Sequence, residues 1–203
     1  MAGAPFDVSG VPRRMLLAYG LPAFVIALPT IPVMVFLPPL YSSGMSLGLA
    51  LTGYILLTGR VFDTTTDPLI GWLSDRYSIW GTRRKPWIAA GAVLAGVGLV
   101  RTLNPPTEPS AIYLLGWSLV LYGGWTMVAV PYLTWGAELS SSYDQRSRIT
   151  SWREGAALIG VVAAGVVNAV AIQLGWSEAA AVGAIAWLAV AFGTVLFLSL
   201  IHI

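Results

Sequence analysis

Residues 60–68 read Arg-Val-Phe-Asp-Thr-Thr-Thr-Asp-Pro, in the middle of a run, 47–73, that is otherwise apolar enough to cross a bilayer. At about 100° per residue, Arg60, Asp63 and Asp67 fall within about 60° of arc, on one face of a helix. Each ionisable side chain at bilayer depth costs about 3 kcal/mol, so such residues mark ion or substrate pathways. The stretch predicts a membrane helix that carries a functional site.

The composition predicts an all-α membrane protein. Hydrophobic residues make up 57% of the 203-residue chain and charged residues 10%, against about 25% charged in soluble proteins. Apolar runs of about 20 residues are long enough to cross the hydrocarbon core as helices. Six such helices are predicted, over residues 15–39, 47–73, 86–103, 111–137, 155–174 and 179–200. Together they leave little room for a soluble domain.

Basic residues gather at one end of the predicted helices. They precede the first span or lie in the second-to-third and fourth-to-fifth connections: Arg13, Arg14, Arg76, Arg83, Arg84, Lys85, Arg146, Arg148 and Arg153. Only Arg101 falls at the opposite end. The positive-inside rule then predicts a cytoplasmic N-terminus in a bacterial inner membrane. Tryptophans near span ends predict an aromatic belt at the interfaces: Trp72, Trp80, Trp87, Trp152 and Trp176.

Prolines interrupt the first predicted span, at positions 22, 29, 32, 38 and 39. Each proline removes a backbone donor and favours a bend, so this helix is expected to be kinked. Kinked helices often line transporter cavities, although proline is also generally commoner in membrane helices than in soluble ones.

Asp63 and Asp67 form a candidate cation site. Two carboxylates about 6 Å apart repel by about 3 kcal/mol at an effective dielectric constant of 20. Binding of a cation, a shared proton or pairing with Arg60 relieves this repulsion. Pro68 leaves the Thr64 carbonyl without its helical donor, and this oxygen and the Thr66 hydroxyl are further hard ligands for Na⁺. The alternative is a structural ion-pair cluster with Arg60, which still leaves one net negative charge.

Residues 60–71 and the loop that follows, with Gly71-Trp72-Leu73-Ser74-Asp75-Arg76 and residues 80–87, form a dense motif. The segments Tyr19-Gly20-Leu21-Pro22, Val130-Pro131-Tyr132 and Gly136-Ala137-Glu138-Leu139 extend it. In these segments the chain resembles the glycoside-pentoside-hexuronide:cation symporters, the melibiose-carrier branch of the major facilitator superfamily. The resemblance implies the N-terminal half of a twelve-helix carrier, built as a three-plus-three inverted repeat. It also implies symport of a solute with Na⁺ or H⁺ by alternating access, without a cofactor.

The resemblance also implies roles for single residues. The cation site comprises Asp63, Asp67, Thr66 and Thr126, and Arg153 faces the substrate. An inner gate would involve Asp75, Arg76, Arg83, Arg84, Glu138 and Arg146. Two alternatives stay open: Arg153 as a helix-end arginine paired with Glu154 or Glu138, and the loop charges as ordinary positive-inside residues. Tyr122 and Trp125 are candidates to stack on a flat substrate, or else packing residues.

The substrate class follows only broadly from the sequence. Melibiose carriers place sugar-binding carboxylates on helix 1 and helix 4, and the corresponding positions here are Pro22 and Ala129, which argues against a galactoside. Another glycoside, a uronide or an amphipathic lipid-like molecule is expected instead. The rival hypothesis is a non-transporting six-helix module for assembly or reception. An enzyme is not expected, because the chain has no cysteine, its only histidine is His202 and no nucleophile or phosphate-binding motif is present.

The last residues, 198–203, are Leu-Ser-Leu-Ile-His-Ile, the translation of a transposon end used as a sequencing adapter. We expect this tail to be non-native and residues 1–197 to form the six-helix bundle. The partner expected in the native protein is a second six-helix half.

Overall fold

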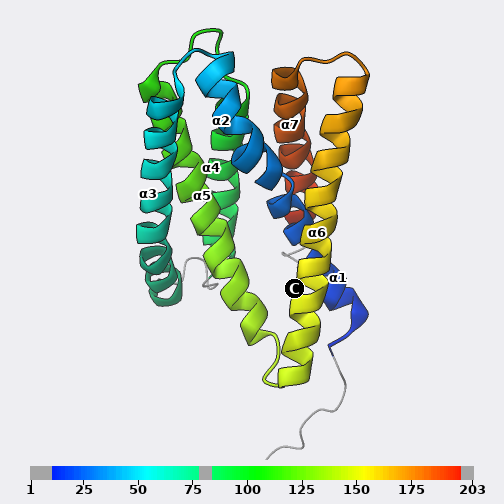
Figure 1. Cartoon of the computed structure of the whole chain (residues 1–203). Coiled ribbons are helices and arrows are strands. Elements are labelled where there is room, and N and C mark those ends of the chain that lie inside the picture. Colours follow the sequence, from blue (N-terminus) through cyan, green and yellow to red (C-terminus); the bar gives the residue numbers. More distant parts are fainter. Residues whose placement is uncertain (1–10, 78–83, 198–203) are drawn as a thin grey trace, which may run out of the picture.

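The computed structural model describes residues 11–77 and 84–197, which form a bundle of long helices (Figure 1). The prediction of an all-α protein is confirmed. The elements follow in the order α1 (Arg13–Ala27), η1 (Pro32–Phe36), α2 (Leu37–Pro39), η2 (Leu40–Gly44), α3 (Leu49–Arg76), α4 (Lys85–Leu103), α5 (Ala111–Glu138), α6 (Tyr143–Gln173) and α7 (Glu178–Leu196). The predicted adapter tail, with His202, and Arg83 lie outside the described residues.

Within the described residues, five segments are long and apolar enough to cross a membrane: Arg13–Gly44, Lys85–Leu103, Ala111–Glu138, Tyr143–Gln173 and Glu178–Leu196. The chain is therefore a multi-pass integral membrane protein. The remaining predicted span, 47–73, corresponds to α3, which has 28 residues, as many as α5. Its charged and polar side chains keep α3 out of this apolar set, because they lower its hydropathy.

The first membrane segment is bent, as the prolines predict. The α-helix α1 ends at Ala27, and two π-helical stretches, η1 and η2, follow before Gly44. Pro29 and Pro32 have no amide hydrogen to continue the regular ladder, so the chain turns and widens there. In Figure 1 the segment changes direction between α1 and α2.

Helix α6, which corresponds to the fifth predicted span, begins earlier than predicted. Its 31 residues start at Tyr143, whereas the predicted span starts at residue 155. The prediction that Arg146, Arg148 and Arg153 lie in an interhelical connection is therefore wrong, since all three lie on α6. At 1.5 Å per residue the helix is about 46 Å long, more than the roughly 30 Å hydrocarbon core, so polar residues extend it beyond the bilayer.

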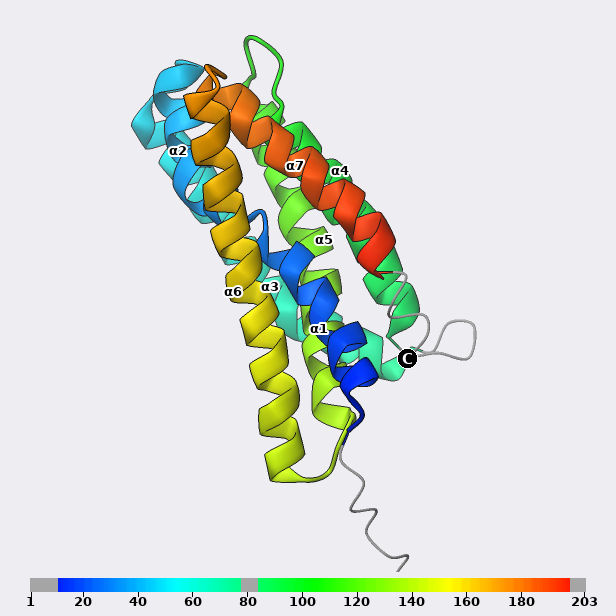
Figure 2. The ribbon, with the colours of Figure 1, turned by 90° about the vertical axis from the view of Figure 1, so that its right-hand side faces the viewer.

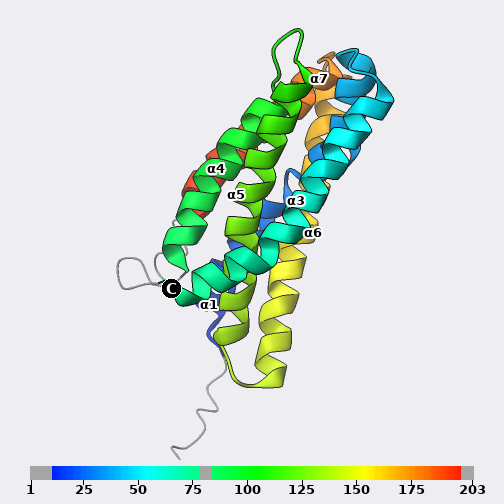
Figure 3. The same ribbon diagram turned by 90° about the vertical axis from the view of Figure 1, so that its left-hand side faces the viewer.

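The helices pair in a regular pattern. α3 packs along α5, α1 packs along α6, and α4 packs against both α5 and α7. Figure 3 shows α3, α5 and α4 side by side, and Figure 2 shows α7 lying in front of α4. α5 thus touches α3 on one face and α4 on another.

Glycines bring α4 and α5 into close backbone contact. A Cβ atom at Gly124 would lie 2.3 Å from the Ala95 backbone nitrogen, and one at Gly98 would lie 2.6 Å from that of Leu121. Small residues stabilise membrane helix pairs because they allow extensive van der Waals contact. The α4–α5 interface is therefore a site of close backbone packing.

The buried side chains form two clusters along the bundle. One includes Tyr41, Leu103 and Leu114, and the other includes Leu16, Tyr19 and Tyr132. Trp125 packs against the first cluster and Trp135 against the second.

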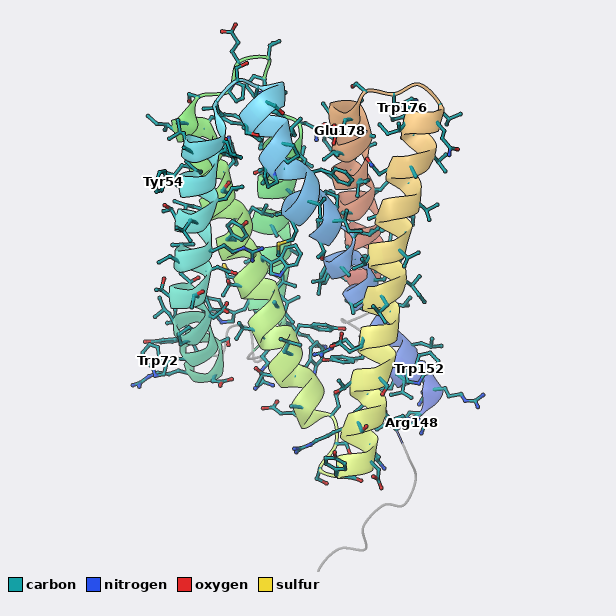
Figure 4. The ribbon with its side chains drawn as sticks, viewed as in Figure 1. Tyr54, Trp72, Arg148, Trp152, Trp176 and Glu178 are labelled. Atoms are coloured by element: carbon teal, nitrogen blue, oxygen red, sulfur yellow. The ribbon has the colours of Figure 1, made fainter. Side chains whose placement is uncertain are left out.

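Tryptophans lie near both ends of the bundle, as an interfacial belt requires. Figure 4 shows Trp176 and Glu178 at one end, with Trp72, Trp152 and Arg148 toward the other. Trp72, Trp152 and Trp176 are each between 41% and 53% exposed. Amphipathic indole rings at such positions anchor a bundle at the lipid headgroups.

Candidate functional site

Asp63 lies where α3 meets α5, and each of its carboxylate oxygens contacts a neighbouring side chain. Oδ1 accepts a hydrogen bond from the Thr126 hydroxyl at 2.8 Å, and Oδ2 lies 3.8 Å from Arg60 Nη1. Thr126 is 1% exposed, and the Asp63 side chain is 23% exposed. Two of the residues expected at the cation site, which lie 63 positions apart, are therefore in direct contact.

Arg60 makes further contacts beside this carboxylate. Its guanidinium lies over the Tyr122 ring at 5.1 Å from the centroid and donates to Met34 Sδ in η1. Gly59 leaves room for this ring, because a Cβ atom there would lie 2.6 Å from Tyr122 Cε2. The side chain expected as a charge partner thus connects the bent first segment, α3 and α5.

Asp67 lies one turn further along α3 and is exposed. Within the described residues it forms no ion pair, so Arg60 balances one aspartate and the pair keeps one net negative charge. The Thr66 hydroxyl donates to the carbonyl oxygens of Phe62, at 2.9 Å, and Asp63, at 3.1 Å. Its own lone pairs stay available to a cation, since a hydroxyl accepts as well as donates.

The donor set is made of oxygens and contains two carboxylates. The described residues hold no group of three or more His, Cys, Asp or Glu side chains placed to bind a metal ion. A strongly chelating transition-metal site would need such a group, whereas two carboxylates with hydroxyl and carbonyl oxygens suit a monovalent hard cation or a proton.

A second charged cluster lies at the α3 and α5 ends nearest the start of α4. Arg84 donates to both carboxylate oxygens of Glu138, one of them at 2.6 Å, and to Asp75 Oδ1 at 3.1 Å. Burial alone lowers the pKa of Arg84, but hydrogen bonds and charge attraction from Glu138 and Asp75 outweigh it, so its pKa is raised. Arg84 therefore stays charged and connects three helices at one point.

The other residues expected in the gate lie elsewhere. Arg76 stacks on the Trp72 ring at 5.3 Å, and Arg146 Nε donates to the Ser140 carbonyl at 2.6 Å. Neither of them belongs to the cluster around Arg84, which consists of Asp75, Arg84 and Glu138.

Arg153 pairs with Glu154 and lies within hydrogen-bonding reach of the Tyr19 hydroxyl. Tyr19 and Tyr132 stack with their centroids 4.7 Å apart, and each hydroxyl donates to the backbone carbonyl of the other residue. Gly136 makes this arrangement possible, because a Cβ atom there would lie 1.9 Å from the Tyr19 hydroxyl oxygen. We did not predict this tyrosine pair, although both tyrosines stand in motifs that carry the family resemblance.

The structure separates the two aromatic side chains expected to stack on substrate. Tyr122 is 6% exposed and faces Arg60 on α3, whereas Trp125 lines an apolar cavity with residues of α1, α4 and α7. The two rings therefore do not share one binding surface.

The comparisons with known proteins agree with this picture. The family described as MFS/sugar transport protein matches residues 18–203. A protein of Escherichia coli K12 provisionally named glycoside/cation symporter YagG is 29% identical over 116 residues, covering 56% of this chain and 25% of its own length. The inner membrane symporter YicJ of the same organism is 30% identical over 125 residues, covering 60% of this chain and 27% of its own length.

A more distant similarity extends over more of the chain. The sodium-dependent lysophosphatidylcholine symporter 1 of Xenopus tropicalis is 27% identical over 168 residues, covering 80% of this chain and 28% of its own length. The matched part of the chain thus covers 25–28% of the length of these relatives. These proteins are transporters rather than enzymes. With a family match over nearly the whole chain and a polar site between two of its membrane helices, the protein belongs to the MFS/sugar transport protein family.

Proposed function

We propose that the chain is the N-terminal, six-helix half of a cation-coupled symporter for a sugar or glycoside, working by alternating access. The observation that carries the proposal is the Asp63 carboxylate, held by Thr126 and Arg60, with Asp67 unpaired nearby within the described residues. One net negative charge in a membrane helix attracts Na⁺ or H⁺, whose binding relieves the repulsion between the carboxylates. The coupling ion needs no additional cofactor.

The proposal adds α3 to the five apolar membrane segments, which brings the number of membrane helices to six. Its contacts with α5 extend the polar site into the bundle, and its length suffices to span a bilayer. The helix pairs support a three-plus-three repeat, in which α1, α3 and α4 of the first unit correspond to α5, α6 and α7 of the second. The α3–α5 contact then has α6–α1 as its counterpart, and the α4–α5 contact has α7–α1.

The Arg84 cluster is proposed as the inner gate. It joins the ends of α3 and α5 to the start of α4. Under the positive-inside rule, the basic residues of α6, with Arg13, Arg14 and Arg76, support the proposal that this end faces the cytoplasm of a bacterial inner membrane. Transport also requires a second six-helix half, which the coverage of the relatives supports.

A second substrate class has its own support. One relative is named for lysophosphatidylcholine, so an amphipathic lipid-like solute is the alternative cargo. The rival role, a non-transporting membrane module, predicts that neutral aspartate variants lose nothing beyond stability.

The test is solute counterflow by the complete gene product in proteoliposomes, screened over glycosides, uronides and lysophospholipids with and without Na⁺. Asp63→Asn and Asp67→Asn should lose the dependence of transport on Na⁺ or on a proton gradient. Asp144→Asn, which neutralises an exposed aspartate in the first turn of α6, is the matched control. Full cation dependence in either site variant would rule out the assignment.

A further inference from the structure

A cavity of about 500 Å³ lies on the side of the bundle away from the Asp63 site. Its walls come from the four helices α1, α4, α5 and α7, and α7 lies in front of α4 in Figure 2. Leu99 and Leu121 belong to one buried cluster, and Ile88 and Val128 belong to the other. The cavity therefore separates the two parts of the core.

An apolar molecule is the expected occupant of this space. Protein interiors hold few voids larger than a water molecule, and an apolar cavity stays dry and accepts apolar guests. The volume is within the roughly 300–1,000 Å³ of typical ligand pockets. At the rim, Val93 is 67% exposed and Val97 is 46% exposed, so the cavity opens to the outer surface of membrane helix α4. The molecules next to such a surface in a bilayer are acyl chains.

A positively charged side chain lines the cavity and favours a lipid with an anionic headgroup. Lys85 is the only charged side chain among the described residues that line the cavity. Its ammonium lies 5.4 Å from the centroid of the Trp135 ring, which also lines the cavity. An ammonium carries three donors, so it can bind a phosphate oxygen in addition to its contacts within the protein. Lysine and tryptophan together are typical of the lipid headgroup level.

We propose that this cavity binds one acyl chain of an anionic phospholipid from the surrounding bilayer, with the lipid phosphate at Lys85. Trp125, for which the sequence left substrate stacking and packing open, forms part of the wall for this acyl chain. The bound lipid fills the space between the two core clusters. It is independent of the cation site, because Tyr122 and Thr126 face α3.

Native mass spectrometry tests the headgroup. The chain is reconstituted in nanodiscs with equimolar phosphatidylglycerol and phosphatidylcholine of identical acyl chains, and the lipids retained after release are counted. The wild type should retain phosphatidylglycerol preferentially. Lys85→Gln should reduce this preference about tenfold, the ratio that 1.4 kcal/mol gives. Lys85→Arg should restore it, and Arg14→Gln, which removes an exposed charge before the first span, should not change it.

A photoactivatable diazirine in the acyl chain of phosphatidylglycerol tests the location in the wild-type protein, without any substitution. Crosslinks should concentrate on α4 and α7 residues of the cavity, such as Val97 and Val190, over the exposed α6 residues Ile159 and Val162. Equal retention of both lipids by the wild type, unchanged retention by Lys85→Gln, or crosslinks spread evenly over α6 would overturn the proposal. Capture of a free fatty acid in place of the phospholipid would also overturn it.

Discussion

The two faces of α5 differ in what they place against their neighbours. Toward α4, Gly124 brings backbone against backbone. Toward α3, Thr126 and Tyr122 meet Asp63 and Arg60, and the helices are joined through side chains. Side chains can change rotamer and charge state, whereas closely packed helix backbones cannot. One face therefore fixes the bundle, and the other can respond to an ion.

The largest effect is expected at the α4 face. Gly124→Ala places a Cβ atom 2.3 Å from the Ala95 backbone nitrogen, where nothing flexible can move aside. The free energy of unfolding should fall by about 3 kcal/mol, the upper part of the usual cost of overpacking. The midpoint of SDS unfolding in mixed micelles measures it. Gly116→Ala on the same helix meets nothing within 4 Å and should be neutral or mildly stabilising.

At the α3 face the same substitution should cost less. Gly59→Ala would bring a Cβ atom within 2.6 Å of Tyr122 Cε2, which is the edge of a side chain that can rotate. We expect a loss of about 2 kcal/mol in unfolding free energy, together with weaker cation binding because the ring supports Arg60. Gly53→Ala, in open space on α3, is the control. A loss as large as that of Gly124→Ala would remove the distinction between the two faces.

The sequence predicted features formed by residues close together in the chain better than contacts between residues far apart in it. Arg60, Asp63 and Asp67 were placed on one helix face by periodicity alone, and the prolines correctly predicted the bent first segment. The Thr126 contact followed from the family resemblance, because no local pattern relates positions 63 and 126. The Tyr19–Tyr132 pair was missed for the same reason, since its partners lie 113 positions apart.

The start of one helix was predicted wrongly because its first residues are polar and yet helical. Hydropathy placed the start of the fifth span at residue 155, but the helix continues back to Tyr143, because backbone hydrogen bonds form equally well outside the bilayer. Trp125 and Tyr122, three positions apart, were considered together in the sequence because both are aromatic. Three positions are about 300° of rotation, and here the 60° difference directs one ring to α3 and the other into the cavity.

The hydrogen bond between Thr126 and Asp63 allows a finer test of the responsive face. Thr126→Val keeps the volume but removes the donor to Oδ1. A hydrogen bond to a charged group is worth about 1.5 kcal/mol, so the Na⁺ dissociation constant should rise about tenfold where Na⁺ is the coupling ion. A proton should instead bind more tightly, because the lost donor stabilised the charged carboxylate. Thr126→Ser should restore the wild-type value, because it retains the hydroxyl. Isothermal titration with Na⁺ and a pH titration of the apparent affinity distinguish the two coupling ions. Unchanged affinity in Thr126→Val would show that this contact is only structural.

The smallest effect is expected where the two faces meet. Arg84 contacts Asp75 on α3 and Glu138 on α5, and it stands directly before α4. The two carboxylates are 58% and 62% exposed, so water can replace the guanidinium when it is removed. Arg84→Gln should therefore lower the unfolding free energy by only about 1 kcal/mol, less at high salt. Because the raised pKa keeps Arg84 charged, this loss should not vary between pH 6 and pH 9, where arginine does not titrate. In a double-mutant cycle with Glu138→Gln, a coupling near zero would mean that the cluster does not join the two faces, and a coupling of about 1 kcal/mol would mean that it does.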